Sequence, residues 1–284
     1  LRQGDSKKVA SLIKEMTSGK VGALITHNVN PSYNLFNAKE FNKALSQVDL
    51  TISSSLYNDE TASLMEYVCA ENHNLESWGD LHPSHNVYSL MQPTIAPLFN
   101  TRQFEETLLR WIDQEDYHSF LSNFWRNKGI KWEKAVHDGY FTYEDETPSI
   151  NKISNFESSN LNILKPKKGL ELVIYEKIGM GDGTQANNPW LQEFPDPISR
   201  ACWDNYMTIS SKTAKEFNLK NWNVSNGAMN GSLVNIKSED ITLENIPVMI
   251  QPGQADNTVG LALGYGRTKA GKAANNVGFN AFPL

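Results

Sequence analysis

Apolar residues in the first part of the chain recur either at the spacing of a helix or in the short unbroken runs typical of buried strands. A helix is expected to begin at Asp5 or Ser6, either of which can cap it, and to end before Gly19. The other elements that the pattern predicts are a strand at 21–25, a helix over 41–48, a strand at 50–54 and a helix from a cap at Asn58 through Glu60 to Cys69. This alternation predicts a parallel α/β sheet domain over residues 1–112.

The periodicity is interrupted twice in the middle of the chain. Residues 71–100 contain three prolines, and we expect a long loop there. Two helices should follow, one that opens at Asn100 or Thr101 and packs through Phe104, Leu108, Trp111 and Ile112, and one with an apolar stripe over 117–125. Residues 127–165 are polar, so we expect a helical and irregular insertion over 113–169.

From residue 170 onward, apolar and polar residues alternate with the period of a strand. A short helix is expected after Ser211. Further strands are expected at 207–210, 233–237, 241–243, 248–250 and 259–263. Many short strands separated by Gly and Pro turns predict a β-barrel domain over residues 170–284.

Composition restricts the classes of protein that fit this chain. Of its 284 residues, 39% are hydrophobic and 20% are charged, as in soluble globular proteins. A net charge of −6, from 26 basic and 32 acidic residues, argues against nucleic acid as a partner, because phosphate binding needs a clustered positive field. No segment approaches the ~20 apolar residues that span a bilayer. The chain begins at Leu1 without a signal peptide, so we expect a piece of a longer protein.

The sequence offers few candidate metal ligands. Cys69 and Cys202 are the only cysteines, too few for a four-thiolate iron–sulfur cluster or a cysteine-rich zinc site, and both are expected to be packed. Six ligand-type residues share one loop, but their spacing matches no common metal motif: His73, His82, His85, Glu71, Glu76 and Asp80. We therefore predict no metal ligand in this chain.

No catalytic residue is predicted either. The chain has no G-x-S-x-G nucleophile elbow. Glu144, Asp145 and Glu146 are neighbours in one polar loop, whereas paired catalytic acids lie on opposite sides of a cleft. His27 lies at a strand end that a ligand could reach, and a buried, hydrogen-bonded histidine is the alternative interpretation.

Two glycine-rich segments are candidates for anion binding. The glycines of 179–183 could hold a phosphate with their backbone N–H groups, but no helical pattern follows them. In the second segment, 264–269, Arg267 adds positive charge, yet the next glycine is Gly271, so the dinucleotide fingerprint is not matched. Two interpretations of this second segment remain open: an anion-binding site, or a tight turn with basic side chains in solvent.

Several longer strings resemble one family, the molybdopterin oxidoreductases. In the first half of the chain they are 58–62, 73–80 and 92–99, and in the second half 187–197, 203–205, 251–256, 263–267 and 280–284. The strings Leu-Glu-Ser-Trp-Gly-Asp at 75–80 and Asn-Pro-Trp-Leu-Gln-Glu at 188–193 are similar to the large iron–sulfur subunit of alternative complex III, a bacterial quinol:electron-acceptor oxidoreductase. The resemblance covers most of 20–100 and 170–284 and is weak over 113–165.

This resemblance implies a fold and a set of site residues. The fold is an α/β sheet domain like the core domain of a molybdopterin oxidoreductase, followed by a double-psi β-barrel of the molybdopterin-dinucleotide-binding type. The implied site is a vestigial cofactor cleft lined by Asn30, Ser54, Asn58 and Asp80 and bordered by Gly264, Tyr265, Gly266 and Arg267. The alternative to a role in the cleft is that each of these residues only forms hydrogen bonds that stabilise its own loop or turn.

The resemblance also implies a role in respiratory electron transfer. In the alternative complex III branch, the molybdopterin-like half acts as a scaffold without cofactor, which implies a structural and docking function. The iron–sulfur clusters are then expected only in the missing part of the subunit. Expected partners are that iron–sulfur half, a quinol-binding membrane subunit and c-type cytochromes, on the periplasmic side of the inner membrane, without a membrane span in this chain.

Two other functions remain open. An active molybdopterin oxidoreductase would hold molybdopterin guanine dinucleotide in an open, basic cleft, whereas Asn, Ser and His stand at the predicted strand ends here. A small-molecule binding module would need an apolar pocket with a few convergent polar groups.

Overall fold

The computed structural model describes residues 4–114, 116–144, 169–238 and 241–284. The chain divides into two compact units, which we call the first unit (1–53, 57–68 and 168–284) and the second unit (54–56 and 69–167). Residues 69–112 therefore share a unit with 113–144. The domain boundaries expected at 112 and 169 stay predictions.

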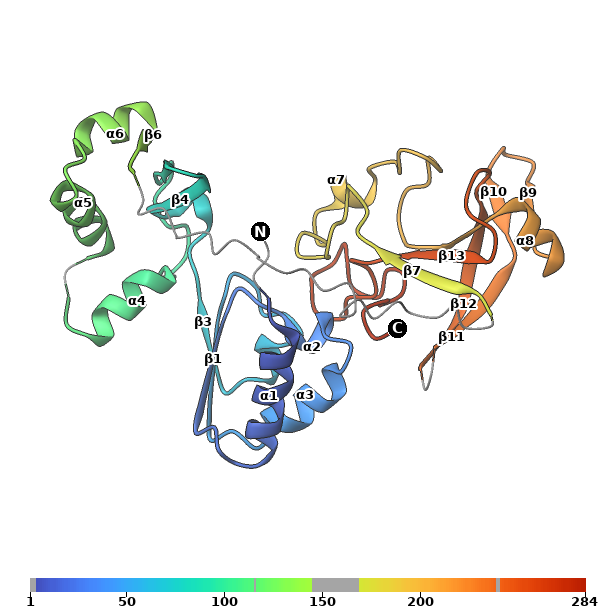
Figure 1. Ribbon diagram of the computed structural model, residues 1–284, viewed down its shortest axis with the longest axis horizontal. Coiled ribbons are helices and arrows are strands. Elements are labelled where there is room, and N and C mark those ends of the chain that lie inside the picture. Colours follow the sequence, from blue (N-terminus) through green and yellow to red (C-terminus); the bar gives the residue numbers. More distant parts are fainter. Residues whose placement is uncertain (1–3, 115, 145–168, 239–240) are drawn as a thin grey trace, which may run out of the picture. The chain divides into compact units, whose positions relative to one another are not determined.

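The N-terminal part of the first unit is a layer of helices against a small sheet (Figure 1). Its elements are α1 (Ser6–Thr17), β1 (Ala23–His27), α2 (Pro31–Asn34), α3 (Ala38–Leu45), β2 (Leu50–Ser55) and β3 (Tyr67–Ala70), with the sheet order β1-β2-β3. Of the two candidate caps, Asp5 caps α1, because its Oδ1 accepts the N–H groups of Lys7 and Lys8 at 2.9 and 3.2 Å. The apolar faces of α1 and α3 form a core of Ile13, Met16, Phe41, Ala44, Leu45 and Met65.

The helix expected from Asn58 to Cys69 is wrong. Only Ala62–Leu64 forms a single 3₁₀ turn, and Tyr67–Ala70 is strand β3. Thr61 rather than Asn58 occupies the N-cap position of this turn, and Asp59 Oδ1 accepts from Thr61 N and Ala62 N at 3.0 and 2.9 Å. The helical spacing of the apolar residues is overridden by pairing with β2, a contact that a local pattern does not contain.

The second unit contains an antiparallel sheet where a loop was expected. Its strands are β4 (Gly79–Ser84), β5 (Val87–Met91) and β6 (Tyr140–Thr142), and β5 lies in the middle. The positive φ of 60° at Asn86 closes the β4–β5 hairpin. The loop prediction for 71–100 is therefore wrong over 79–91. The hairpin was missed because Pro83 stands within β4 and is unfavourable in a strand.

Three helices complete the described part of the second unit: α4 (Phe104–Trp111), α5 (Tyr117–Asn127) and α6 (Trp132–Asp138). The predicted helix over 117–125 is confirmed, and so is a helix over 104–111, but its expected start at Asn100 or Thr101 is wrong because α4 begins at Phe104. Helix α6 corrects the irregular segment expected there. The core consists of Leu121, Trp125, Trp132, Ala135 and Phe141. On α4 the expected packing face is wrong, because Leu109 is buried whereas Trp111 and Ile112 are 55% and 64% exposed. Asp145 and Glu146 of the acidic run lie outside the described residues.

The C-terminal part of the first unit is built on a mixed sheet of five strands, in the order β11-β12-β8-β13-β7. These are β7 (Glu171–Tyr175), β8 (Met207–Ile209), β11 (Leu233–Ser238), β12 (Ile241–Ile250) and β13 (Thr258–Ala262). β12 pairs with β8, and β13 with β7, in parallel, and the other neighbours are antiparallel. The strands expected at 241–243 and 248–250 are one continuous strand. Mixed α/β structure with parallel strand pairs is confirmed, and the double-psi barrel stays a prediction.

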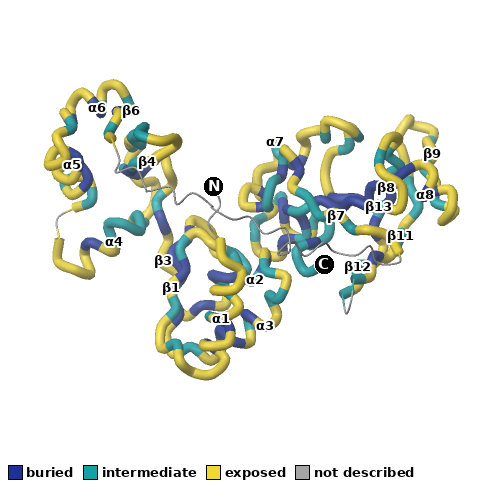
Figure 2. The backbone as a smooth tube through the Cα atoms, in the orientation of Figure 1, coloured by how far each residue is buried: buried dark blue, intermediate teal, exposed yellow. Residues whose placement is uncertain are grey.

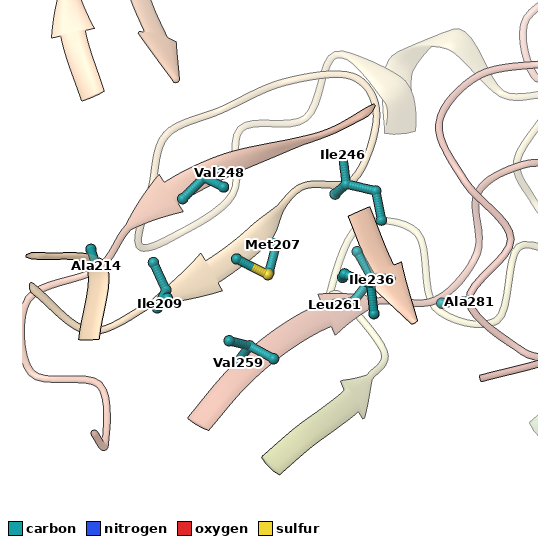
Figure 3. Close-up of a cluster of buried hydrophobic side chains, with 9 residues drawn as sticks. All are labelled: Met207, Ile209, Ala214, Ile236, Ile246, Val248, Val259, Leu261 and Ala281. Carbon is teal, nitrogen blue, oxygen red and sulfur yellow. The ribbon is translucent and has the colours of Figure 1, made fainter. Parts of the chain in front are cut away.

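Shorter elements surround this sheet. They are α7 (Pro189–Gln192), α8 (Ser211–Glu216) and the pair β9 (Asn221–Asn223) and β10 (Met229–Gly231). The core is formed by side chains from β8, β11, β12 and β13 together with Ala214 and Ala281, and Figure 2 shows β8 and β13 as largely buried. Figure 3 shows its side chains, which are Met207, Ile209, Ala214, Ile236, Ile246, Val248, Val259, Leu261 and Ala281. Each large side chain buried there contributes about 1.5–3 kcal/mol to stability.

Candidate functional site

A glycine-dependent turn follows β13 and forms one wall of the candidate site. We call residues 264–269 the glycine turn; Gly264 and Gly266 have φ values of +93° and +69°. A Cβ atom on Gly266 would lie 2.1 Å from Asn280 N, and one on Gly264 would lie 2.7 Å from Met180 Cγ. Only glycine fits both positions, and the turn holds Tyr265 and Arg267 inside the first unit, each 5% exposed.

The Arg267 guanidinium forms a two-pronged ion pair with Glu60. Arg267 Nε lies 3.0 and 3.1 Å from the two Glu60 carboxylate oxygens, and Nη2 lies 2.8 Å from Oε2. Arg267 Nη1 donates to the Gly183 carbonyl oxygen at 2.7 Å, and the guanidinium stacks 4.7 Å from the centre of the Tyr33 ring. The side chains of Arg267 and Glu60 are only 7% and 11% exposed. Contacts within the protein therefore engage all three guanidinium nitrogens.

Glu60 accepts further hydrogen bonds beyond those from Arg267. The backbone N–H groups of Thr268 and Lys269 donate to Glu60 Oε1 at 2.7 and 3.0 Å. Asn30 Nδ2 donates to Glu60 Oε2 at 2.7 Å, while Asn30 Oδ1 accepts from Thr61 Oγ1 at 2.7 Å. Asn30, which follows β1, is thus bound to Glu60 and Thr61, the two residues before the 3₁₀ turn.

These contacts determine the charge state of Glu60. Burial by itself would raise the pKa of this carboxyl, but hydrogen bonds from Arg267, Lys269, Asn30 and Thr268 outweigh burial and lower the pKa to about 2. Glu60 is therefore a carboxylate at any physiological pH, and its negative charge balances the positive charge of Arg267.

Tyr33 packs against another side of the Arg267 guanidinium and contacts the C-terminal part of the first unit. Tyr33 Oη donates to the Tyr265 carbonyl oxygen at 2.8 Å, and the Tyr33 ring meets Phe282 edge-on at 5.2 Å. Burial raises the pKa of Tyr33, so the hydroxyl remains a donor. Asn280 Nδ2 donates to the Tyr33 carbonyl oxygen at 3.0 Å. These hydrogen bonds of Tyr33, like the ion pair of Arg267, join the α/β part of the first unit to its C-terminal part.

The two glycine-rich segments considered separately in the sequence lie against each other. Gly183 has a φ of +87°, and a Cβ atom there would lie 2.7 Å from the Gly264 carbonyl oxygen. Since Gly183 also accepts a hydrogen bond from Arg267, the 179–183 segment forms part of the same cluster.

A buried lysine lies near this cluster. Lys177 is 8% exposed, and its Nζ lies 4.3 Å from the ring centre of Tyr206 and 5.4 Å from that of Tyr265. Burial lowers the pKa of Lys177, and the carboxylates of Asp196 and Asp204 oppose that effect. The rings stabilise the ammonium as cation–π partners.

The structure brings together only part of the expected cleft. Asn30 and 264–267 lie in the Glu60–Arg267 cluster, whereas Asn58 is exposed. Ser54 and Asp80 belong to the second unit, where Ser54 donates to Glu71 and Asp80 accepts from Trp125 Nε1.

Sequence reasoning missed Glu60 and Tyr33 as members of the site. A signal was present for Glu60: an arginine in a glycine-rich turn needs an acid if it is buried, and Glu60 lies just beyond a predicted strand end.

Two of the six candidate metal ligands between residues 71 and 85 instead form hydrogen bonds with the protein backbone. His73 Nδ1 accepts from Leu75 N at 3.2 Å, while Glu76 accepts from His73 N at 2.8 Å and from Leu98 N at 3.0 Å. In the part of the chain that the structure describes, no group of three or more His, Cys, Asp or Glu residues could hold a metal ion. The expectation that Cys69 and Cys202 are packed is wrong, because both are exposed.

A cavity of about 270 Å³ lies beside β7, β8 and β13. Its lining includes Val173, Tyr175, Ile198 and Tyr206, together with Gln254. Gln254 Nε2 donates to Thr208 O and Thr258 O, whereas Gln254 Oε1 is buried and has no hydrogen-bond partner among the described residues. None of the eight residues of the expected cleft lines this cavity, and the alternative of a small-molecule binding module in that cleft stays a prediction.

Comparisons with known proteins support the resemblance seen in the sequence. No protein-family model matches the chain. The chain is 22% identical over 294 aligned residues to the molybdopterin-binding-like subunit of menaquinone reductase from Nitratidesulfovibrio vulgaris Hildenborough, across 99% of this chain and 41% of that protein. It thus spans about two fifths of that relative's length.

A solved structure has the same fold. Acetylene hydratase from Pelobacter acetylenicus superposes with a TM-score of 0.65 at 15% identity, over 90% of this chain and 39% of that enzyme. At this identity the match concerns the fold alone. Together with the menaquinone reductase relative, it confirms the resemblance to molybdopterin oxidoreductases.

Proposed function

We propose that this chain is part of a subunit of a membrane-associated respiratory quinol oxidoreductase of the alternative complex III type, where it acts as a structural docking scaffold. The respiratory role is supported by the similarity to a subunit of menaquinone reductase. The scaffold role is supported by the state of Arg267, the one cationic side chain among the eight expected cleft residues. Arg267 is buried, and Glu60 and Gly183 occupy its donor groups.

The fit of a pterin dinucleotide can be judged from the same contacts. The resemblance implies that the glycine turn would face such a cofactor, whose diphosphate needs N–H donors and positive charge. Here the Thr268 and Lys269 amides and the Arg267 guanidinium all bond to the Glu60 carboxylate. A diphosphate would have to compete with a carboxylate that is already paired. These residues do not fit the cofactor, and we propose that the cleft holds none.

The proposed setting rests on the resemblance of the sequence strings, and the menaquinone reductase relative supports only its association with a respiratory membrane complex. We place the chain on the periplasmic side of a bacterial inner membrane, beside an iron–sulfur half, a quinol-binding membrane subunit and c-type cytochromes. Within the described ranges, no helix has both the length and the apolar character that crossing a bilayer requires. We further propose that the mixed sheet of the first unit belongs to a double-psi β-barrel, in keeping with the fold match.

Metal and pterin analysis of the native full-length protein tests the scaffold proposal. Molybdenum and tungsten are measured by mass spectrometry, and the oxidised pterin is extracted and measured by fluorescence. We expect both to be far below one equivalent per protein. Molybdenum or tungsten near one equivalent, with pterin, would overturn the proposal and favour the alternative of an active molybdopterin oxidoreductase.

A further inference from the structure

Five N–H groups converge on the Glu60 carboxylate. Oε1 accepts from Thr268 N at 2.7 Å, from Lys269 N at 3.0 Å and from Arg267 Nε at 3.0 Å. Oε2 accepts from Asn30 Nδ2 at 2.7 Å and from Arg267 Nη2 at 2.8 Å. With a side chain only 11% exposed, this carboxylate exchanges nearly all of its water contacts for contacts within the protein.

The donor set is larger than an ion pair needs. A guanidinium alone satisfies a carboxylate through two parallel hydrogen bonds. Consecutive backbone N–H groups in a turn with positive φ values, joined by a guanidinium, form the kind of concave donor array that holds phosphate oxygens. The residues preceding Thr268 and Lys269 supply that turn, since Gly264 and Gly266 both have positive φ.

We infer that Asn30 and residues 267–269 form an oxyanion-binding site, and that the Glu60 side chain is its built-in anion. The chemical class of ligand that the site takes, once this carboxylate is removed, is a phosphate or diphosphate. This inference rests on the proposed function, because it gives the physical reason why the cleft of a scaffold would exclude a cofactor diphosphate.

Two effects keep a free anion out while Glu60 is present. The carboxylate is tethered beside its donors, so its effective concentration far exceeds that of a dissolved anion. An incoming phosphate would also lie within a few ångströms of a second negative charge in a poorly hydrated site, where like charges repel strongly. Removal of the carboxylate reverses both effects and leaves Arg267 unpaired.

The test compares phosphate binding by variants of the full-length protein. Glu60→Ala removes the built-in anion, and Glu66→Ala is the matched control, because Glu66 is an exposed glutamate of the same unit. Inorganic phosphate and pyrophosphate are titrated at constant ionic strength, and binding is followed by calorimetry and by phosphorus NMR. We expect the Glu60→Ala variant to bind at least about tenfold more tightly than the wild type or the control. Adding Arg267→Ala to Glu60→Ala should abolish that gain.

Two results would overturn the inference. One is a folded Glu60→Ala variant that binds phosphate no better than Glu66→Ala. The other is a wild-type protein that binds phosphate as tightly as Glu60→Ala does. In either case Glu60 and Arg267 would be an ordinary structural ion pair.

Thermal unfolding covers the case in which Glu60→Ala folds poorly. Its midpoint is measured in phosphate and in chloride of equal ionic strength, because a ligand that binds only the folded state raises the midpoint. Because phosphate also stabilises folded proteins nonspecifically, a rise of the midpoint in phosphate over chloride supports the inference when it is larger for Glu60→Ala than for Glu66→Ala. An equal rise in the two variants, or a Glu60→Ala variant that is unfolded in both salts, contradicts it. The metal and pterin analysis of the wild type is a separate measurement, so failure of this inference is distinguishable from failure of the proposed function.

Discussion

At the scale of single residues, the Glu60–Arg267 pair shows why a buried charge needs more than one partner. Moving either ion out of water costs several kcal/mol, and Coulomb attraction alone offsets this only when the remaining hydrogen-bonding capacity is also satisfied. Both ions meet this condition here, Arg267 through Gly183 and Glu60 through Asn30 and the glycine turn. The pair is therefore a specific structural junction, and removal of one partner leaves the other uncompensated.

The pH dependence of stability should report directly on Glu60. Its pKa is lowered in the folded protein, from 4.5 to about 2, so its stabilising effect is complete above pH 4.5 and is lost as the pH falls toward 2. A shift of this size corresponds to about 3 kcal/mol. Urea unfolding of the wild type and of Glu60→Gln between pH 6 and pH 2 measures the difference.

The wild type should lose its advantage over Glu60→Gln across that interval. A difference between the two proteins that stays constant from pH 6 to pH 2 would show that Glu60 is not held ionised by its donors. Glu66→Gln serves as the control, since it removes an exposed carboxylate of the same unit.

At the scale of elements, polar side chains stabilise the loops and turns between the helices and strands. The strings that carry the family resemblance contain several polar residues bonded to nearby backbone. Glu76 bonds to the amides of His73 and Leu98, Gln192 Nε2 donates to Ala186 O, and Asn205 bonds to Phe279 N and O. In this protein those strings therefore build loop structure, whatever else they do in relatives.

The glycine turn provides a test at this scale. Gly266→Ala should destabilise the protein strongly, because the new Cβ would lie 2.1 Å from Asn280 N and φ is +69°. Gly227→Ala is the matched control, since its φ is +82° but nothing lies within 4 Å of the added atom. The control should cost about 1–2 kcal/mol, the penalty for a left-handed alanine, and Gly266→Ala at least about 2 kcal/mol more because of the clash.

Chemical denaturation of both variants measures this difference. Equal losses of stability would mean that the backbone around Asn280 moves aside readily. The close packing of the glycine turn against 279–280 would then contribute little to the site.

At the scale of the whole molecule, the hydrophobic core of the second unit is separate from those of the first, and within the first unit the core of the α/β part and that of the C-terminal part are linked by the Glu60–Arg267 cluster. The second unit is centred on Trp125 and Trp132, and the C-terminal part of the first on Ile209, Ile246 and Leu261. A cooperative folding unit is defined by such a core, so we expect the two units to unfold in separate calorimetric transitions.

Core truncations assign those transitions. Trp125→Ala should lower the stability of the second unit by about 3–5 kcal/mol and leave the other transition in place, and Ile246→Ala should lower that of the first by about 2–5 kcal/mol. Trp111→Ala is the control, because Trp111 is 55% exposed on the same unit as Trp125. One shared transition that both core variants shift together would contradict the prediction.

The sequence by itself determined those elements whose signal is local. The helices α1, α3 and α5 and the strands β2, β7, β8 and β13 were predicted because each carries its own apolar period, and Asp5 was one of two candidate caps for α1. The family resemblance likewise came from contiguous strings, and the comparisons confirm it.

Only the tertiary structure decided the features that depend on partners distant in sequence. β3 replaced a predicted helix because β2 pairs with it, and Arg267 became an internal charge because Glu60, 207 positions away, meets it. Local patterns report which face of a segment is apolar, but they carry no information about which distant donor completes a buried acceptor. The sequence therefore named Asn30 and Arg267 as site residues, and the fold alone added Glu60, the carboxylate that joins them.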